Sequence, residues 1–258
     1  MTSPSERLIV ALDVSSAKDA QNIVSGLGDA VQLYKVGMQL YTAEGPEVVR
    51  DLVASGRKVF LDLKYHDIPN TVAAAVREAS QLGVSMLTVH ASGGTKMLHA
   101  AVEAAKTQAG VNAGPSLEMT PGSTTGLKIL AVTVLTSMDD QDLDETGVHG
   151  PVEDQVLWLA SLALDARCAG VISSPREVRT LRAKLGSEFL VVTPGVRPAG
   201  AAHGDQARVA TPSEAIAAGA THIVVGRPIT AAANPSAEAE KILRELETQP
   251  SELQTQGQ

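Results

Sequence analysis

Short aliphatic runs recur along the whole chain, and stretches with helical spacing of apolar residues lie between most of them. The runs are dominated by Val, Leu and Ile, as in parallel strands that are buried on both faces. They predict strands at 8–14, 33–38, 58–64, 86–91, 128–136, 170–174, 189–196 and 222–229. The intervening stretches predict helices, several of them closed by a glycine, at 17–28, 45–56, 70–83, 152–170, 174–186 and 211–220.

This alternation of strands and helices predicts a single (β/α)8 TIM barrel, for which 258 residues is an ordinary length. An open doubly wound sheet is the structural alternative. No GxGxxG follows the first run, where that fold usually binds a dinucleotide. We therefore expect a catalytic barrel domain over 1–246, with a connection rich in Gly, Pro, Ser and Thr at 107–127 and a polar, frayed tail at 247–258.

Composition and charge restrict the partners and the cellular location. A net charge of -8 argues against non-specific binding of nucleic acid or of an anionic membrane surface, although a local basic pocket for a small anion remains compatible with it. The single cysteine, Cys168, excludes an intramolecular disulfide and a CxxC metal site. The first residues, MTSPSERLIVALDV, resemble neither a signal peptide nor a membrane span, so we expect a cytoplasmic protein.

The strand predicted at 58–64 carries charged residues within an apolar run, and the loop after it adds Asp67. Because side chains alternate across a strand, Asp62 and Lys64 share one face. The other face carries Val59, Leu61 and Leu63. Burying charges is costly unless they pair or act, so these residues fit catalytic chemistry, and they equally fit a structural salt bridge at a strand end.

Other polar residues lie at the ends of further predicted strands, where a barrel of this kind places its active site. They are Asp13, Lys35, Thr136, Arg197, Gly226 and Arg227. Alone, Gly226 fits a tight turn and Arg227 a solvated charge. Loops after the seventh and eighth strands of such barrels often bind phosphate through backbone amides, so the position of this pair favours a phosphorylated ligand.

Taken together, these motifs closely resemble the bacterial type of orotidine 5'-phosphate decarboxylase over nearly the whole chain. The matching segments are ALDV at 11–14, YKVG at 34–37, DLKYHDIPNT at 62–71, TVHASGG at 88–94, AVTVLTSM at 131–138, VTPGVRP at 192–198 and GDQARVATPSEAIAAGATHIVVGRPI at 204–229. The resemblance implies conversion of orotidine 5'-phosphate to UMP and carbon dioxide, the last step of de novo UMP synthesis. It also implies a homodimer and no cofactor.

The resemblance also implies roles for individual residues. Lys64, Asp62, Asp67 and Lys35 would form a catalytic chain of charges, and Asp67, with Ile68 and Thr71, would reach the neighbouring subunit's site. The substrate-binding set would comprise Asp13 and Lys35 at the ribose, Thr136 at the nucleotide, Gln206 between phosphate and pyrimidine, and Arg197, Gly226 and Arg227 at the phosphate. The 107–127 segment is longer than the family's connection there.

These residues suit a reaction that leaves a carbanion in the plane of the pyrimidine ring, where the π system cannot delocalise it. The chain shows no cofactor motif, and His66, His90 and His99 lack metal-ligand spacing, so we expect no metal and a reaction carried by electrostatics. Lys64, held by Asp62 and Asp67, is then the general acid that protonates C6. Ground-state destabilisation by a nearby carboxylate ranks second.

Two alternatives remain open. A hexulose-phosphate synthase type of barrel shares a DxKxxD arrangement but uses a divalent metal, and the HDIPNT continuation and Gln206 favour the decarboxylase over it. A non-catalytic module that senses UMP predicts a broken charge chain, whereas Asp62, Lys64 and Asp67 are all present.

Overall fold

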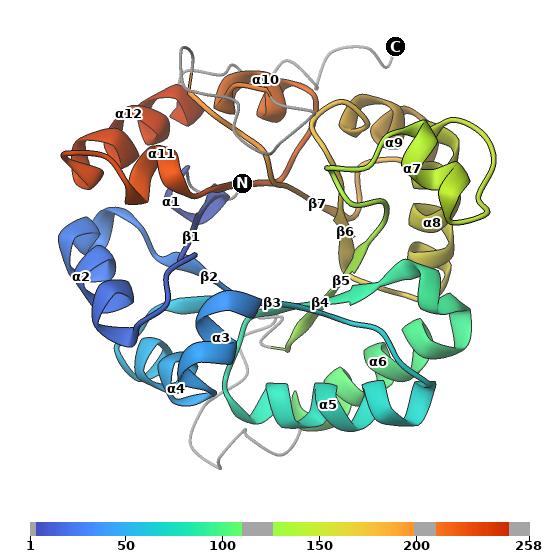
Figure 1. The fold of residues 1–258 in the computed structure, drawn as a ribbon, viewed down its shortest axis with the longest axis horizontal. Coiled ribbons are helices and arrows are strands. Elements are labelled where there is room, and N and C mark those ends of the chain that lie inside the picture. The colour runs from blue at the N-terminus through green and yellow to red at the C-terminus, as the bar shows by residue number, and fades with distance from the viewer. Residues whose placement is uncertain (1–3, 110–125, 199–209, 248–258) are drawn as a thin grey trace, which may run out of the picture.

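The computed structural model describes residues 4–109, 126–198 and 210–247. Within these residues, eight parallel strands close into a barrel in sequence order, and helices surround it (Figure 1). This confirms the predicted (β/α)8 fold. The strands are β1 (Leu8–Ala11), β2 (Leu33–Gly37), β3 (Lys58–Tyr65), β4 (Met86–His90), β5 (Lys128–Val132), β6 (Gly170–Ile172), β7 (Leu190–Thr193) and β8 (His222–Val225).

All predicted strands are present, but every strand except β3 ends before its predicted limit. The residues that follow leave the hydrogen-bonded ladder and turn toward the mouth of the barrel, so apolar runs overestimate strand length there. The larger helices are α2 (Ala17–Leu27), α4 (Glu47–Ala54), α5 (Pro69–Gln81), α6 (Gly94–Ala109), α8 (Val152–Asp165), α9 (Val178–Leu185) and α12 (Pro235–Glu247). Shorter ones are α1 (Pro4–Arg7), α3 (Met38–Glu44), α7 (Asp140–Glu145), α10 (Pro212–Ala217) and α11 (Arg227–Thr230).

Two of the predicted segment limits need correction. Residues 107–109, expected in the connection, belong to helix α6, which continues to Ala109. Glu247, expected in the tail, is the last residue of helix α12. Residues 110–125 and 248–258 of these two predicted segments lie outside the described residues.

Aliphatic side chains form two concentric layers of core. The outer layer lies between the strands and the helices and includes Val59 and Leu61 of β3. The inner layer fills the barrel and includes Phe60 of the same strand together with Leu130 and Val224. Adjacent residues of β3 thus face opposite layers, as strand alternation requires. The same alternation directs Asp62 inward, toward the open end of the barrel.

The opposite end of the barrel is closed by buried groups. His222, at the start of β8, is 6% exposed, and its Nδ1 lies 2.9 Å from Thr221 Oγ1. Burial lowers the pKa of His222 to about 4, and the nearby cations Lys128 and Arg7 act in the same direction. This end is therefore built for stability, and the carboxyl ends of the strands are left to carry the site. Among the described residues, no helix has both the length and the apolar character needed to cross a membrane.

Candidate active site

A cavity of about 680 Å³ opens at the carboxyl ends of the strands. Its floor is apolar, with side chains such as Phe60, Val132 and Ile172, and charged side chains surround its mouth. The charged lining residues are Asp13, Lys35, Asp62, Lys64, Arg197 and Arg227. A cavity that is apolar at the base and carries a few convergent polar groups is the usual form of a small-molecule site.

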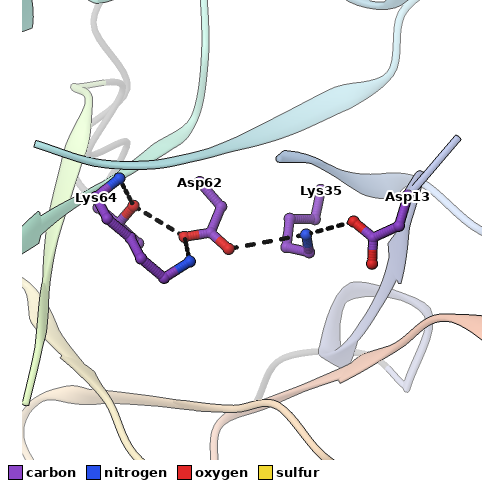
Figure 2. Close-up of polar contacts among 5 residues, drawn as sticks. Asp13, Lys35, Asp62 and Lys64 are labelled. Atoms are coloured by element: carbon purple, nitrogen blue, oxygen red, sulfur yellow. Dashed lines mark hydrogen bonds and ion pairs between the residues drawn. The ribbon is translucent and has the colours of Figure 1, made fainter. Parts of the chain in front are cut away.

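Four of these side chains form a row of alternating charge (Figure 2). Lys35 Nζ lies 2.9 Å from Asp13 Oδ1 and 3.7 Å from Asp62 Oδ2, and Lys64 Nζ lies 2.8 Å from Asp62 Oδ1. The side chain of Asp62 is 14% exposed and that of Lys35 12%, so the central pair is largely shielded from water. Ion pairs of this kind are costly to desolvate, and their position on a cavity wall favours a functional role over a purely structural one.

Gly37, at the end of β2, leaves the space that the Lys35 ammonium occupies. A Cβ built on Gly37 would lie 2.8 Å from Lys35 Nζ and 3.4 Å from Asp13 Oδ1. Any larger residue at position 37 would therefore push the ammonium away from its position between the two carboxylates.

Thr88 is a site residue that the sequence analysis missed. It is fully buried on β4, and its hydroxyl donates to Asp62 Oδ1 at 3.0 Å. Thr88 Oγ1 in turn accepts from the Lys64 backbone N–H at 2.9 Å. A signal was available, because Thr88 is the polar residue within the apolar run 86–89. It shares the inward face of its strand with Met86.

The backbone at Lys64 is unusual. Its φ is +51°, a left-handed conformation that costs a non-glycine residue about 1–2 kcal/mol. Pairing with β4 runs through Leu61↔Leu87 and resumes at Tyr65↔Val89, so β3 advances four residues while β4 advances two. The irregularity lifts Lys64 out of the ladder while the Thr88 hydroxyl holds its N–H. Strain of this type persists only where the surrounding structure imposes it, and strained residues are concentrated at functional sites.

Asp67 does not join the row of charges within one chain. Its Oδ1 accepts from the Ile68 N–H at 2.6 Å, and Asp67, Ile68 and Thr71 are all exposed. The expectation that Asp62 and Asp67 together hold Lys64 is thus met within the chain only by Asp62. The loop between β3 and α5 directs Asp67 outward, with the Ile68 side chain 67% exposed beside it.

The predicted phosphate-binding residues follow β7 and β8 or lie outside the described part. Arg197 follows β7, and its backbone N–H donates to the Ala210 carbonyl oxygen at 2.9 Å. Among the described residues, its buried Nε has no hydrogen-bond partner. Gly226 and Arg227 do not extend β8 as predicted, because Gly226 precedes helix α11 and Arg227 is its first residue. Gln206 lies outside the described residues.

Thr136 lines the cavity, although it does not end a strand as predicted. Strand β5 stops at Val132, and Thr136 lies in the loop that follows. Within the described ranges, no three His, Cys, Asp or Glu side chains are placed to hold a metal ion.

Comparison with known proteins agrees with this geometry. The family model described as "Orotidine 5'-phosphate decarboxylase / HUMPS family" matches residues 6–242. A protein named orotidine 5'-phosphate decarboxylase from Anaeromyxobacter sp. (strain K) is 50% identical over 239 residues, which are 93% of this chain and 97% of that protein. One from Moorella thermoacetica is 47% identical over 243 residues, 94% of this chain and 92% of that protein.

A solved structure gives the same result. The crystal structure of orotidine 5'-phosphate decarboxylase from Lactobacillus acidophilus superposes with a TM-score of 0.78 at 40% identity, covering 92% of this chain and 97% of that one. The match of sequence, fold and length extends over almost all of both chains. The chain therefore belongs to the orotidine 5'-phosphate decarboxylase / HUMPS family.

Proposed function

We propose that this protein converts orotidine 5'-phosphate to UMP and carbon dioxide, the last step of de novo UMP synthesis. The observation that carries the proposal is the row Asp13, Lys35, Asp62 and Lys64 on one wall of a cavity that is also lined by two arginines, Arg197 after β7 and Arg227 after β8. Strand β7 lies four strands from β3 in the barrel, so Arg197 and Lys64 face the cavity from opposite sides. Relatives that bear the decarboxylase name support the same reaction.

Lys64 is the general acid of this proposal. Cleavage of the bond between C6 and the carboxylate releases carbon dioxide and leaves the bonding electron pair on C6. An ammonium placed there stabilises the developing negative charge and then donates the proton that completes UMP. Asp62, 2.8 Å away, orients the Lys64 ammonium, and Lys35 extends the row toward the ribose side with Asp13.

Phosphate binding contributes to the chemistry in this proposal. Enzymes lower barriers by roughly 8–23 kcal/mol, and one ammonium seldom supplies that much. Binding energy from a remote group can offset the cost of desolvation and orientation at C6. Arg197 and Arg227, with Gly226 between β8 and α11, provide the cationic wall for the phosphate, and Thr136 is close enough to line the same cavity.

A homodimer completes the proposed site. Asp67 is exposed, and within the described part of the chain the ion-pair partner of Lys64 is Asp62. The apolar side chains of Ile68 and Met38 are 67% and 56% exposed near this end of the barrel. Paired across a two-fold axis, such loops would bury the apolar side chains and bring Asp67, with Thr71, into the partner's cavity. The proposal places this dimer in the cytoplasm.

Ultraviolet absorbance provides the test. Purified, EDTA-treated protein is mixed with orotidine 5'-phosphate and the change in absorbance of the pyrimidine is followed. Turnover by the unaltered chain, lost in Lys64→Ala and kept in the matched control Lys96→Ala on the exposed face of α6, supports the proposal. Because Lys64→Ala leaves the phosphate wall intact, it should still bind UMP.

The same experiment separates the alternatives. An enzyme of the hexulose-phosphate synthase type would not turn over orotidine 5'-phosphate after EDTA treatment, and it would need a divalent metal for its phosphosugar reaction. A UMP-binding module would bind UMP without turning over substrate. Substantial residual turnover by Lys64→Ala would remove Lys64 from the role of general acid.

A further inference from the structure

The loop that carries Asp67 is held at one end by a contact between two histidines. The ring centroids of His66 and His90 are 5.4 Å apart, with the ring planes tilted by 39°. The last paired residues of the two strands are Tyr65 and Val89; His66 is the first residue after β3, and His90 is the last residue of β4. The contact therefore lies directly after the irregular stretch around Lys64.

Gly93 has no side chain, and this leaves room for the His66 ring. A Cβ built on Gly93 would lie 3.2 Å from His66 Cδ2, 2.1 Å from Met97 Sδ and 2.5 Å from Met97 Cε. The volume that any side chain at position 93 would fill is thus already occupied by the imidazole and by a thioether that is 1% exposed. The φ of Gly93 is outside the left-handed region, so steric room is what position 93 requires.

His90 is suited to receive a second imidazole. Burial lowers its pKa, and His66 and Lys64 lower it further, while Asp62 opposes them. The lowered pKa favours the neutral form of His90, in which the two rings pack without repulsion between like charges. The charged groups that face it are the same Lys64 and Asp62 that form the proposed site.

The other end of the loop is also fixed. Pro69 begins helix α5, and the Asp67 carboxylate accepts from the Ile68 N–H between these two points. Only Asp67 and Ile68 separate His66 from the helix. The contact between His66 and His90 on one side and the start of helix α5 on the other limit the directions open to Asp67.

We propose that His66, packed between His90 and the bare Cα of Gly93, is a positioning residue that fixes the direction in which Asp67 leaves its own subunit. The inference rests on the proposed function, because it assigns His66 an effect on turnover that passes through Asp67. His66 itself touches no substrate in this scheme. Loss of its ring frees the loop, and misplacement of a catalytic group by about 1 Å can cost on the order of 100-fold in rate.

A double-mutant cycle on the full-length protein tests this inference. We expect His66→Ala to lower kcat for orotidine 5'-phosphate by about 10-fold to 100-fold with a smaller change in KM. His66→Phe, which keeps a ring at the contact, should recover most of the rate. His66→Gln, which keeps a polar side chain but removes the ring, should lower kcat in the same way. His99→Ala, an exposed histidine on α6, is the matched control and should behave like the parent.

The decisive comparison is made in the Asp67→Asn background. If His66 acts through Asp67, adding His66→Ala there should change kcat by less than 2-fold. A full multiplicative loss in that background, or an unchanged kcat in the single variant, overturns the inference while the parent protein still turns over. Absence of turnover by the parent protein overturns the proposed function, and this inference with it. If His66→Ala unfolds, His66→Gln completes the same cycle.

Discussion

Replacing Thr88 by valine tests how Lys64 is held. The substitution keeps the shape of a fully buried side chain but removes the hydroxyl that donates to Asp62 and accepts from the Lys64 N–H. A hydrogen bond to a charged group contributes about 1.5–3 kcal/mol, and an unsatisfied buried N–H costs about 1–3 kcal/mol. Relaxation of the left-handed Lys64 backbone recovers about 1–2 kcal/mol of this.

These contributions partly cancel, so Thr88→Val should have a modest effect on the free energy of unfolding and a large effect on kcat. We expect Thr88→Val to lower the free energy of unfolding by roughly 2 kcal/mol. Lys64 would no longer be fixed against Asp62, and a displacement of the ammonium by about 1 Å should lower kcat on the order of 100-fold. UMP affinity should change little, because Arg197 and Arg227, the proposed phosphate ligands, follow other strands, β7 and β8.

Steady-state decarboxylation and denaturant unfolding measure the two quantities separately. Thr88→Ser restores the hydroxyl and should recover most of the rate. Thr133→Val is the matched control, because it removes another buried hydroxyl, the one that donates to Ile172 O at 3.0 Å. A Thr88→Val enzyme with the parent's kcat, or a Thr133→Val enzyme equally slow, would refute the reasoning.

Three further predictions address other parts of the molecule. Arg227→Ala should lower kcat/KM for orotidine 5'-phosphate by far more than it weakens UMP binding, because phosphate binding supports the transition state; an unchanged kcat/KM contradicts this. Gly37→Ala should displace the Lys35 ammonium and slow turnover while the thermal unfolding midpoint stays within a few degrees, and equal losses of both would point to a folding defect instead. Buried His222 takes up its proton only near pH 4 when folded but near pH 6.5 when unfolded, so stability falls as pH drops through this window. Between pH 7 and pH 4.5, the free energy of unfolding in urea should fall by roughly 2 kcal/mol less in His222→Gln than in the parent. Equal losses in the two proteins would show that another group is responsible.

The fold was predictable because parallel barrel strands are buried on both faces and read as aliphatic runs. The carboxyl ends of the strands could not be predicted in the same way. The apolar runs continue to Asp13 and Thr136, although β1 and β5 have already ended. The pairing of Asp62 with Lys64 followed from strand alternation, yet the left-handed Lys64 could not be foreseen, since lysine has no preference for that conformation. The exposure of Asp67 could not be foreseen, because the alternation of side chains along a strand does not extend into the loop that carries it.

The cavity and the chain as a whole carry opposite signs of charge. Among the described residues that line the cavity, four cations and two anions leave a local excess of two positive charges, on a chain whose net charge is -8. At physiological ionic strength the Debye length is about 8 Å, so distant carboxylates are screened from a ligand at the mouth more than the cavity's own charges are. A phosphorylated anion is thus attracted only on close approach to one face of the barrel. The electrostatic potential therefore steers anions toward the mouth of the barrel and away from the rest of the surface. Lowering the ionic strength should strengthen both the attraction at the mouth and the repulsion elsewhere.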